Sequence, residues 1–150
     1  PPPVVGGPPP PAPAVLDAPD ALVLPPPAGS GVVEEMRVPG SIAGDLRPWQ
    51  PAGVRFLHKR WCRGEGAVLN DDMGLGKTVQ TIAFLAAVLG KTGDARRDAV
   101  PNAAGRRALL VVPASVRRNW EAEFERWGQF HVVACHTGAA GRGGGAGGGG

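Results

Sequence analysis

The run Asp71-Asp72-Met73-Gly74-Leu75-Gly76-Lys77-Thr78 decides the expected fold of this chain. It follows a short apolar stretch, 66–70, and precedes a helical pattern over 78–89, which is the strand–loop–helix context of a phosphate-binding loop. Two glycines let the backbone turn its N–H groups inward without a clash of Cβ atoms. The N-terminus of the following helix adds partial positive charge where phosphate oxygens would lie. The run therefore predicts binding of a nucleoside triphosphate.

Lys77 and Thr78 are the residues of this run with the most chemistry to offer. Lys77 can reach the β- and γ-phosphates, and the Thr78 hydroxyl can ligate Mg²⁺, so we expect Lys77 to be catalytic and Thr78 to be the metal ligand. The strict pattern has a glycine where Asp71 stands, and Asp71 is expected to hydrogen-bond within the loop or to another lobe. A glycine-rich turn with an incidental lysine is the alternative. The predicted nucleotide contacts in the loop are Asp72, Met73, Gly74, Leu75, Gly76, Lys77 and Thr78.

Short apolar runs around this loop predict a β-sheet. The runs at 66–70, 108–112 and 130–135 are typical of buried strands, and a further short strand is expected within 32–38. Together with the intervening helical patterns, the order is strand–loop–helix–strand–helix–strand. This order predicts an α/β fold, a parallel sheet with helices on its faces.

Apolar residues at helical spacing predict three helices. The first covers 48–61 and has a proline at its start, where a missing N–H is tolerated. The second covers 78–89 and ends at Gly90, and the third covers 115–127 with Ser115 as its N-cap. The residues expected to be buried are Trp49, Gly53, Phe56, Leu57 and Trp61 in the first helix, Val79, Ile82, Ala83, Ala86 and Leu89 in the second, and Val116, Trp120, Phe124 and Trp127 in the third.

The two ends of the chain differ in composition from its middle. Residues 1–31 hold twelve prolines, and nine of the last thirteen residues are glycine. Neither stretch can bury enough apolar surface to offset the entropy of ordering it. We therefore expect a disordered leader at 1–31, a folded lobe at 32–137 with a surface loop over 91–107, and a disordered tail at 138–150. Position 1 is not methionine, so we interpret the chain as a fragment of a longer protein or a broken gene model.

Charge and cysteine content exclude several classes of protein. The chain has 16 Lys and Arg against 13 Asp and Glu, a net charge of +3, which permits an anionic partner without requiring one. Cys62 and Cys135 have no CxxC spacing, so neither a disulfide framework nor a zinc site is expected. The longest strongly apolar stretch, 81–89, is shorter than the roughly 20 residues of a membrane span. With no secretory leader at the start, a soluble intracellular protein is expected.

Four blocks of sequence, in this order, resemble the Snf2 family of helicase-like ATPases. They are Leu-Arg-Pro-Trp-Gln at 46–50, Gly-Val-Arg-Phe-Leu at 53–57, the segment 68–82 that contains the loop, and Leu-Val-Val-Pro-Ala-Ser-Val at 110–116. The Asp-Asp-Met-Gly-Leu-Gly-Lys-Thr form of the loop is characteristic of this family. The resemblance covers about 42–138 and implies part of a RecA-like ATP-binding lobe. Within the family, the loop and the helix after it lean toward the excision-repair, Cockayne-syndrome-B-like branch.

The resemblance implies roles for residues outside the loop. Gln50 matches the glutamine that reads the adenine, since a side-chain amide can both donate and accept hydrogen bonds. Its alternative is an ordinary exposed glutamine of a helix. Pro113, Ala114 and Ser115 match a segment that lies against the DNA backbone in the family, and Arg117 would reinforce that contact. The alternatives there are simple helix capping by Ser115 and a solvated Arg117.

The resemblance also implies an activity, that of an ATP-dependent translocase on double-stranded DNA in chromatin remodelling or DNA repair. It implies ATP and Mg²⁺ as cofactors, nucleosomes or repair proteins as partners, and a nuclear location. An acidic Asp-Glu-x-His-type motif and a second lobe, which hydrolysis would need, are not found in the sequence. We therefore expect the chain to bind ATP–Mg²⁺ without hydrolysing it alone. The alternatives are another P-loop NTPase and a truncated, non-catalytic nucleotide-binding or interaction fragment.

Overall fold

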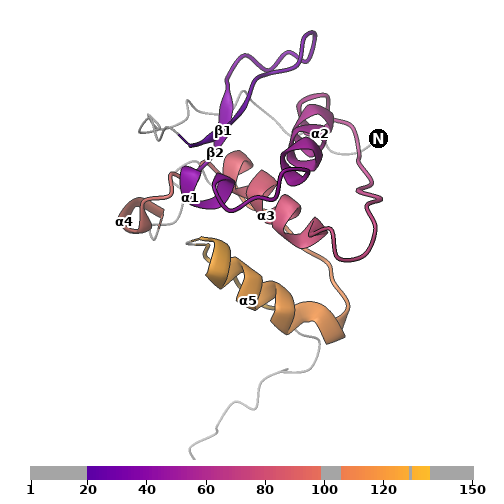
Figure 1. Cartoon of the computed structure of the whole chain (residues 1–150), viewed down its shortest axis with the longest axis vertical. Helices are drawn as coiled ribbons and strands as arrows, with labels where there is room; N and C mark the ends of the chain where they lie inside the picture. The colour runs from indigo at the N-terminus through magenta and orange to yellow at the C-terminus, as the bar shows by residue number, and fades with distance from the viewer. Residues whose placement is uncertain (1–19, 99–105, 129, 136–150) are drawn as a thin grey trace, which may run out of the picture.

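The computed structural model describes residues 20–98, 106–128 and 130–135 (Figure 1). Most of the predicted leader and the whole predicted tail lie outside the described residues. The described elements are the strands β1 (Leu22–Leu24) and β2 (Met36–Val38), the helices α1 (Gly40–Ala43), α2 (Gln50–Cys62), α3 (Lys77–Val88), α4 (Ala95–Asp98) and α5 (Arg117–Trp127), and a 3₁₀ turn (Ala114–Val116) that leads into α5.

Helix α3 lies at the centre of the described structure, with α2 and the strands on one side and α5 on the other (Figure 1). Its small buried side chains allow close approach of these neighbours, and Ile82 is fully buried. The predicted burial of α3 is confirmed except at Leu89, which is only half-buried. The main hydrophobic cluster consists of Leu24, Met36, Val38, Ile42, Val54, Ala83, Ala86 and Ala87.

The sheet is a two-stranded antiparallel ladder rather than the predicted parallel sheet. Strand β1 pairs with β2 in a register that sets Leu22 opposite Val38. Strand β2 confirms the strand expected within 32–38, whereas β1 lies in the stretch expected to be disordered, so that prediction is wrong for Leu22–Leu24. Leu24 is fully buried, and removal of its side chain from water helps to offset the entropy cost of ordering this proline-rich stretch.

The three apolar runs predicted as strands, 66–70, 108–112 and 130–135, form no strand in the described structure. Val68 is 80% exposed and Leu109 is 89% exposed. A strand needs a neighbour for its backbone N–H and C=O groups, and the described sheet contains only β1 and β2. The apolar character of these runs is apparent in the sequence, but the sequence does not show which segments would pair with them.

Helix α2 confirms the first predicted helix but buries a different face. Its buried residues are Gln50, Val54, His58 and Cys62, a single row at four-residue spacing. The predicted core residues Trp49, Phe56 and Trp61 are instead 36–46% exposed. The Arg60 guanidinium lies 5.6 Å from the centre of the Phe56 ring, a cation–π contact that stabilises this exposed aromatic. Two buried polar residues in the row explain why apolar spacing alone selected the wrong face.

The chain after α3 turns at Gly90, as predicted. Gly90 has a φ of 67°, its N–H donates to Ala87 C=O at 3.1 Å, and the next N–H, that of Lys91, donates to Ala86 C=O at 2.9 Å. This pair of bonds is the Schellman pattern that ends helices at a left-handed glycine. The predicted surface loop that follows, 91–107, contains the short helix α4.

Helix α5 begins later than predicted. A 3₁₀ turn occupies Ala114–Val116, Val116 takes the cap position, and no side chain caps the helix. The prediction that Ser115 is the N-cap is therefore wrong. Phe124 is buried, and the half-buried Trp127 packs against the main cluster, as the helical spacing predicted. Helix α5 thus covers the side of α3 that faces away from α2.

Candidate nucleotide-binding site

Residues 71–76 form the turn that leads directly into α3. Gly74 and Gly76 have φ angles of 89° and 81°, a region that residues with a Cβ atom rarely adopt. Gly76 takes the N-cap position of α3, and no side chain caps this helix. N–H groups at the start of a helix have no partner within the helix, so this end of α3 is suited to an anion. Both predicted glycines thus have backbone conformations that favour glycine at these positions.

Lys77, the first residue of α3, folds back over the loop. Its Nζ donates to the backbone carbonyl oxygens of Asp71, at 2.7 Å, and Asp72, at 2.9 Å. Both acceptors are neutral carbonyls, which bind an ammonium group less strongly than charged oxygens do. Phosphate oxygens could therefore replace them with a gain in interaction energy. Thr78, the predicted metal ligand, is the next residue of the helix and is half-buried.

Gln50, at the start of α2, packs against the same loop. Its Oε1 accepts the Arg47 N–H at 2.9 Å, and its Nε2 donates to Leu75 C=O at 3.1 Å. Trp49 Nε1 donates to the same Leu75 oxygen at 3.3 Å. Gln50 is buried, so it is not the exposed helix glutamine that was the alternative. A Cβ atom on Gly76 would overlap Gln50 Nε2, so this glycine is needed for close approach as well as for its φ angle.

Gln80 ties the loop to the two helices, and the sequence analysis did not single it out. Its Nε2 donates to Asp71 Oδ2 at 2.9 Å, and its side chain is 1% exposed. Gly53 of α2 lies so close that a Cβ atom there would overlap Gln80 Oε1. Asp71 was expected to hydrogen-bond within the loop or to another lobe, and its partner instead lies on α3. The sequence did offer a signal for this role, because Gln80 is a polar residue that lies between the predicted buried positions Val79 and Ile82 of the same helix.

The other predicted loop contacts lie at the surface. Met73 is 98% exposed, and Asp72 and Gly74 are also exposed, while Leu75 is half-buried. The Asp72 side chain is thus free of the loop's interior, although its backbone carbonyl holds Lys77. The structure therefore separates the predicted residues into an inner group around Lys77 and an outer rim around Met73.

The predicted DNA-contacting segment lies at the start of α5, at the lower right of Figure 1. Pro113, Ala114 and Ser115 are all exposed. Arg117 donates to Glu121 Oε1 at 2.6 Å, one helical turn further on. Helical ion pairs at this four-residue spacing contribute only about 0.3–0.5 kcal/mol, so Arg117 can exchange this partner for another anion at small cost. Helix α5 packs against α3, which links this segment to the helix that begins at the loop.

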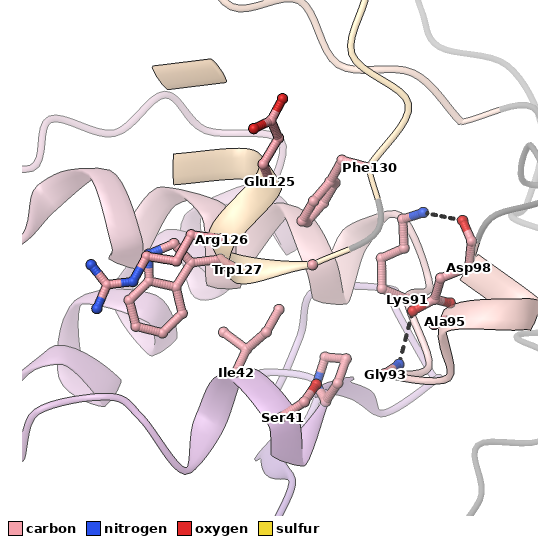
Figure 2. Close-up of a pocket in the computed structure, with 12 residues that line it drawn as sticks. Ser41, Ile42, Lys91, Gly93, Ala95, Asp98, Glu125, Arg126, Trp127 and Phe130 are labelled. Carbon is pink, nitrogen blue, oxygen red and sulfur yellow. Dashed lines mark hydrogen bonds between the residues drawn. The ribbon is translucent and has the colours of Figure 1, made fainter. Parts of the chain in front are cut away.

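A separate hollow of about 220 Å³ lies between α1, α4 and the end of α5 (Figure 2). Its lining includes Ile42, Lys91 and Trp127, and no residue of 71–78 contributes to it. Lys91 Nζ donates to Asp98 C=O at 3.0 Å. Burial lowers the pKa of Lys91, and the nearby Asp98 carboxylate opposes that shift. The hollow is therefore distinct from the loop.

Mg²⁺ bound together with a nucleotide takes most of its ligands from phosphate oxygens and water, with one or two from the protein. The residues present fit that requirement, because Thr78 offers a hydroxyl beside Lys77 at the start of α3. Among residues 20–98, 106–128 and 130–135, no group of three or more His, Cys, Asp or Glu side chains could hold a metal by itself. In the same part of the chain, no helix has the length and apolar character needed to cross a membrane.

Residues 49–142 match the SNF2-related domain, and this chain belongs to that family. The match confirms the resemblance to Snf2 proteins. The chain is 43% identical over 109 residues to Switch 2 of Arabidopsis thaliana, and 39% identical over 113 residues to DNA excision repair protein ERCC-6-like 2 of Mus musculus. These alignments cover 73% and 66% of this chain, but the chain spans only 13% and 7% of the two relatives. No solved structure matches it.

Proposed function

We propose that this chain binds ATP with Mg²⁺ through residues 72–78. The observation that carries the proposal is the position of Lys77 Nζ, which is held at the N-terminus of α3 by the carbonyl oxygens of Asp71 and Asp72. Three features that favour phosphate binding lie together there: an ammonium group, a helix N-terminus and glycines in the left-handed conformation. Thr78 would ligate Mg²⁺ on the same turn, and Lys77 would neutralise charge on the β- and γ-phosphates.

Gln50 is proposed to read the adenine. An amide nitrogen has two hydrogens and an amide oxygen has two lone pairs, so the bonds of Gln50 to Leu75 and Arg47 leave one of each for a ligand. Gln50 also touches Gly76, so a base bound at Gln50 would lie next to phosphates bound at the loop. This closeness supports one nucleotide that contacts both residues.

For a longer protein that contains this segment, we propose an ATP-dependent translocase on double-stranded DNA, located in the nucleus and acting in chromatin remodelling or DNA repair. Family membership supports this proposal, as does the relative named as a DNA excision repair protein. The similarity to ERCC-6-like 2 favours the excision-repair branch. Exposed Pro113, Ala114 and Ser115, with Arg117 beside them, would contact the DNA backbone.

The family also supports a RecA-like arrangement of the apolar runs. We propose that 66–70, 108–112 and 130–135 become parallel strands in that longer protein, where further segments can pair with them. Their exposed apolar side chains, with Leu109 at 89% and Val111 at 88%, favour such burial. Nucleotide turnover is assigned to the longer protein, because the chain spans at most 13% of the first two relatives.

The test of nucleotide binding is a titration of the chain with a fluorescent ATP analogue and Mg²⁺. Lys77→Ala removes the ammonium group from the phosphate site, and we expect the Kd to rise at least about tenfold, because charge-assisted hydrogen bonds contribute roughly 1.5–3 kcal/mol. Lys59→Ala is the matched control, since it removes the same charge from an exposed position of α2. Equal Kd values for Lys77→Ala and Lys59→Ala would contradict the assignment of the loop.

A further inference from the structure

The side chain of Gln80 is a buried polar group for which ATP binding, as proposed above, has no use. It is 1% exposed, and its Nε2 donates to Asp71 Oδ2 at 2.9 Å. Burial of an amide costs free energy unless its hydrogen bonds are made. The bond to Asp71 meets this requirement for the amide nitrogen, and because its acceptor is a carboxylate it is stronger than a bond between neutral groups. Gln80 therefore holds the first residue of the loop.

Helix α3 holds Asp71 at two separate points. Gln80 binds its carboxylate, while Lys77 Nζ binds its backbone carbonyl at 2.7 Å. Lys77 and Gln80 are three residues apart, so they share one face of α3. The two bonds use different acceptor atoms, since one involves the side chain of Asp71 and the other its backbone.

Only one of these two bonds uses a group that the proposed function assigns to the nucleotide. The ammonium group of Lys77 would exchange carbonyl oxygens of Asp71 and Asp72 for the more strongly binding phosphate oxygens, a step that rests on the proposed function. We propose that Gln80 is a positioning residue, which keeps Asp71 and the start of the loop on α3 while Lys77 exchanges these carbonyls for phosphate oxygens. A loop held in this way loses less conformational entropy when the nucleotide binds.

Gly53 of α2 leaves the space that the Gln80 side chain occupies. A Cβ atom at this position would overlap Gln80 Oε1 and would lie 2.9 Å from its Cδ. The same Cβ atom would lie 3.4 Å from Leu69 Cδ1, which precedes the loop. The Gln80 amide is thus confined between α2 and the loop, and a side chain with locked rotamers positions its partner precisely enough for binding.

The test exchanges the donor and the acceptor. Gln80→Glu keeps the shape of the side chain but sets one carboxylate against another, and we expect the Kd for Mg-ATP to rise about tenfold. Asp71→Asn alone leaves an amide oxygen that still accepts from Gln80, so the Kd should stay within about threefold of wild type. The double variant Asp71→Asn/Gln80→Glu restores a donor–acceptor pair with the roles reversed, and its Kd should return to within about threefold.

A second measurement needs no nucleotide. Hydrogen–deuterium exchange of the backbone amides of 71–76 should become faster in Gln80→Glu and return toward the wild-type rate in the double variant. Asp45→Asn, at an exposed position after α1, is the control for loss of a carboxylate and should leave both measurements unchanged. If Gln80→Glu does not fold, Gln80→Met removes the hydrogen bond at similar volume and takes its place.

The outcomes separate the two proposals. A wild-type chain that does not bind Mg-ATP would refute the proposed function, while the exchange rates would still decide whether Gln80 holds the loop. Normal affinity and normal exchange in Gln80→Glu would overturn the positioning role. So would a double variant that stays as impaired as Gln80→Glu, because a merely structural defect is not repaired by reversing donor and acceptor.

Discussion

Helices α2 and α3 and the apolar runs at 108–112 and 130–135 are equally apparent in the sequence, yet only the helices form as predicted. A helix satisfies most of its backbone hydrogen bonds within itself, whereas a strand depends on a partner that can lie far away in the sequence. The difference is visible in burial, since Ile82 of α3 is fully buried and Leu109 is 89% exposed. Among the described residues, the predicted elements that form are therefore mainly those whose backbone hydrogen bonds need only local partners.

The candidate site resembles the helices in this comparison, because its contacts form without a strand. Its contacts join the start of α2, the loop and the first turns of α3, and none of them requires a strand. Gln50 contacts Leu75, and Gln80 contacts Asp71. The contacts of the candidate site are thus formed although the described residues contain no parallel sheet around them.

The largest expected effect comes from truncating a side chain in each region. Ile82→Ala should lower the free energy of unfolding by about 2–4 kcal/mol, because it removes buried apolar atoms and leaves a cavity. Leu109→Ala removes a side chain of the same size from an exposed position, and its effect should be within about 0.5 kcal/mol. Urea unfolding of both variants, followed by circular dichroism, measures the difference.

Equal destabilisation by these two substitutions would break the comparison. It would mean that the run at 108–112 packs in solution as closely as α3 does. In that case the parallel sheet would already form within this chain, and the proposal that it needs further segments would fail.

Much of the local structure was predictable from the sequence. The glycines of the loop, the helix that starts at Lys77 and the turn at Gly90 follow from backbone geometry that few other residues allow. The buried face of α2 was not predictable from apolar spacing, because Gln50 and His58 are buried through specific polar contacts. Those contacts depend on the position of α2 against the loop and on side-chain geometry, which residue spacing does not specify.

A smaller effect is expected from adding one methyl group to α2. Gly53→Ala should raise the helix propensity, worth about 1 kcal/mol. It would also displace the Gln80 amide, and overpacking costs about 1–3 kcal/mol. We expect a net loss of about 1 kcal/mol in the free energy of unfolding, together with weaker Mg-ATP binding.

Gly66→Ala is the matched control for this substitution. No atom lies within 4 Å of a Cβ atom built at Gly66, which is in the first of the apolar runs. Its effect on stability should be within about 0.5 kcal/mol. A Gly53→Ala variant as stable as wild type, with unchanged Mg-ATP affinity, would show that Gln80 has room to move.

The smallest expected effect concerns pH and compares two histidines, one in each region. His58 of α2 is buried, with Nε2 3.3 Å from Cys62 Sγ, and burial lowers its pKa from the usual 6.5. As the pH falls below 6.5, His58 therefore takes up a proton in the unfolded chain before it does so in the folded chain. The stability that is present above this pH is lost as the pH falls through the lower pKa of His58 in the folded chain. The slope of stability against pH cannot exceed about 1.4 kcal/mol per pH unit for one group.

Urea unfolding between about pH 7.5 and about pH 5.5 measures this loss of stability. The loss should appear in wild type and in His131→Gln, whose histidine is exposed, and it should be smaller in His58→Gln. The same loss in His58→Gln as in His131→Gln would place the responsible group elsewhere and remove the distinction between the two histidines.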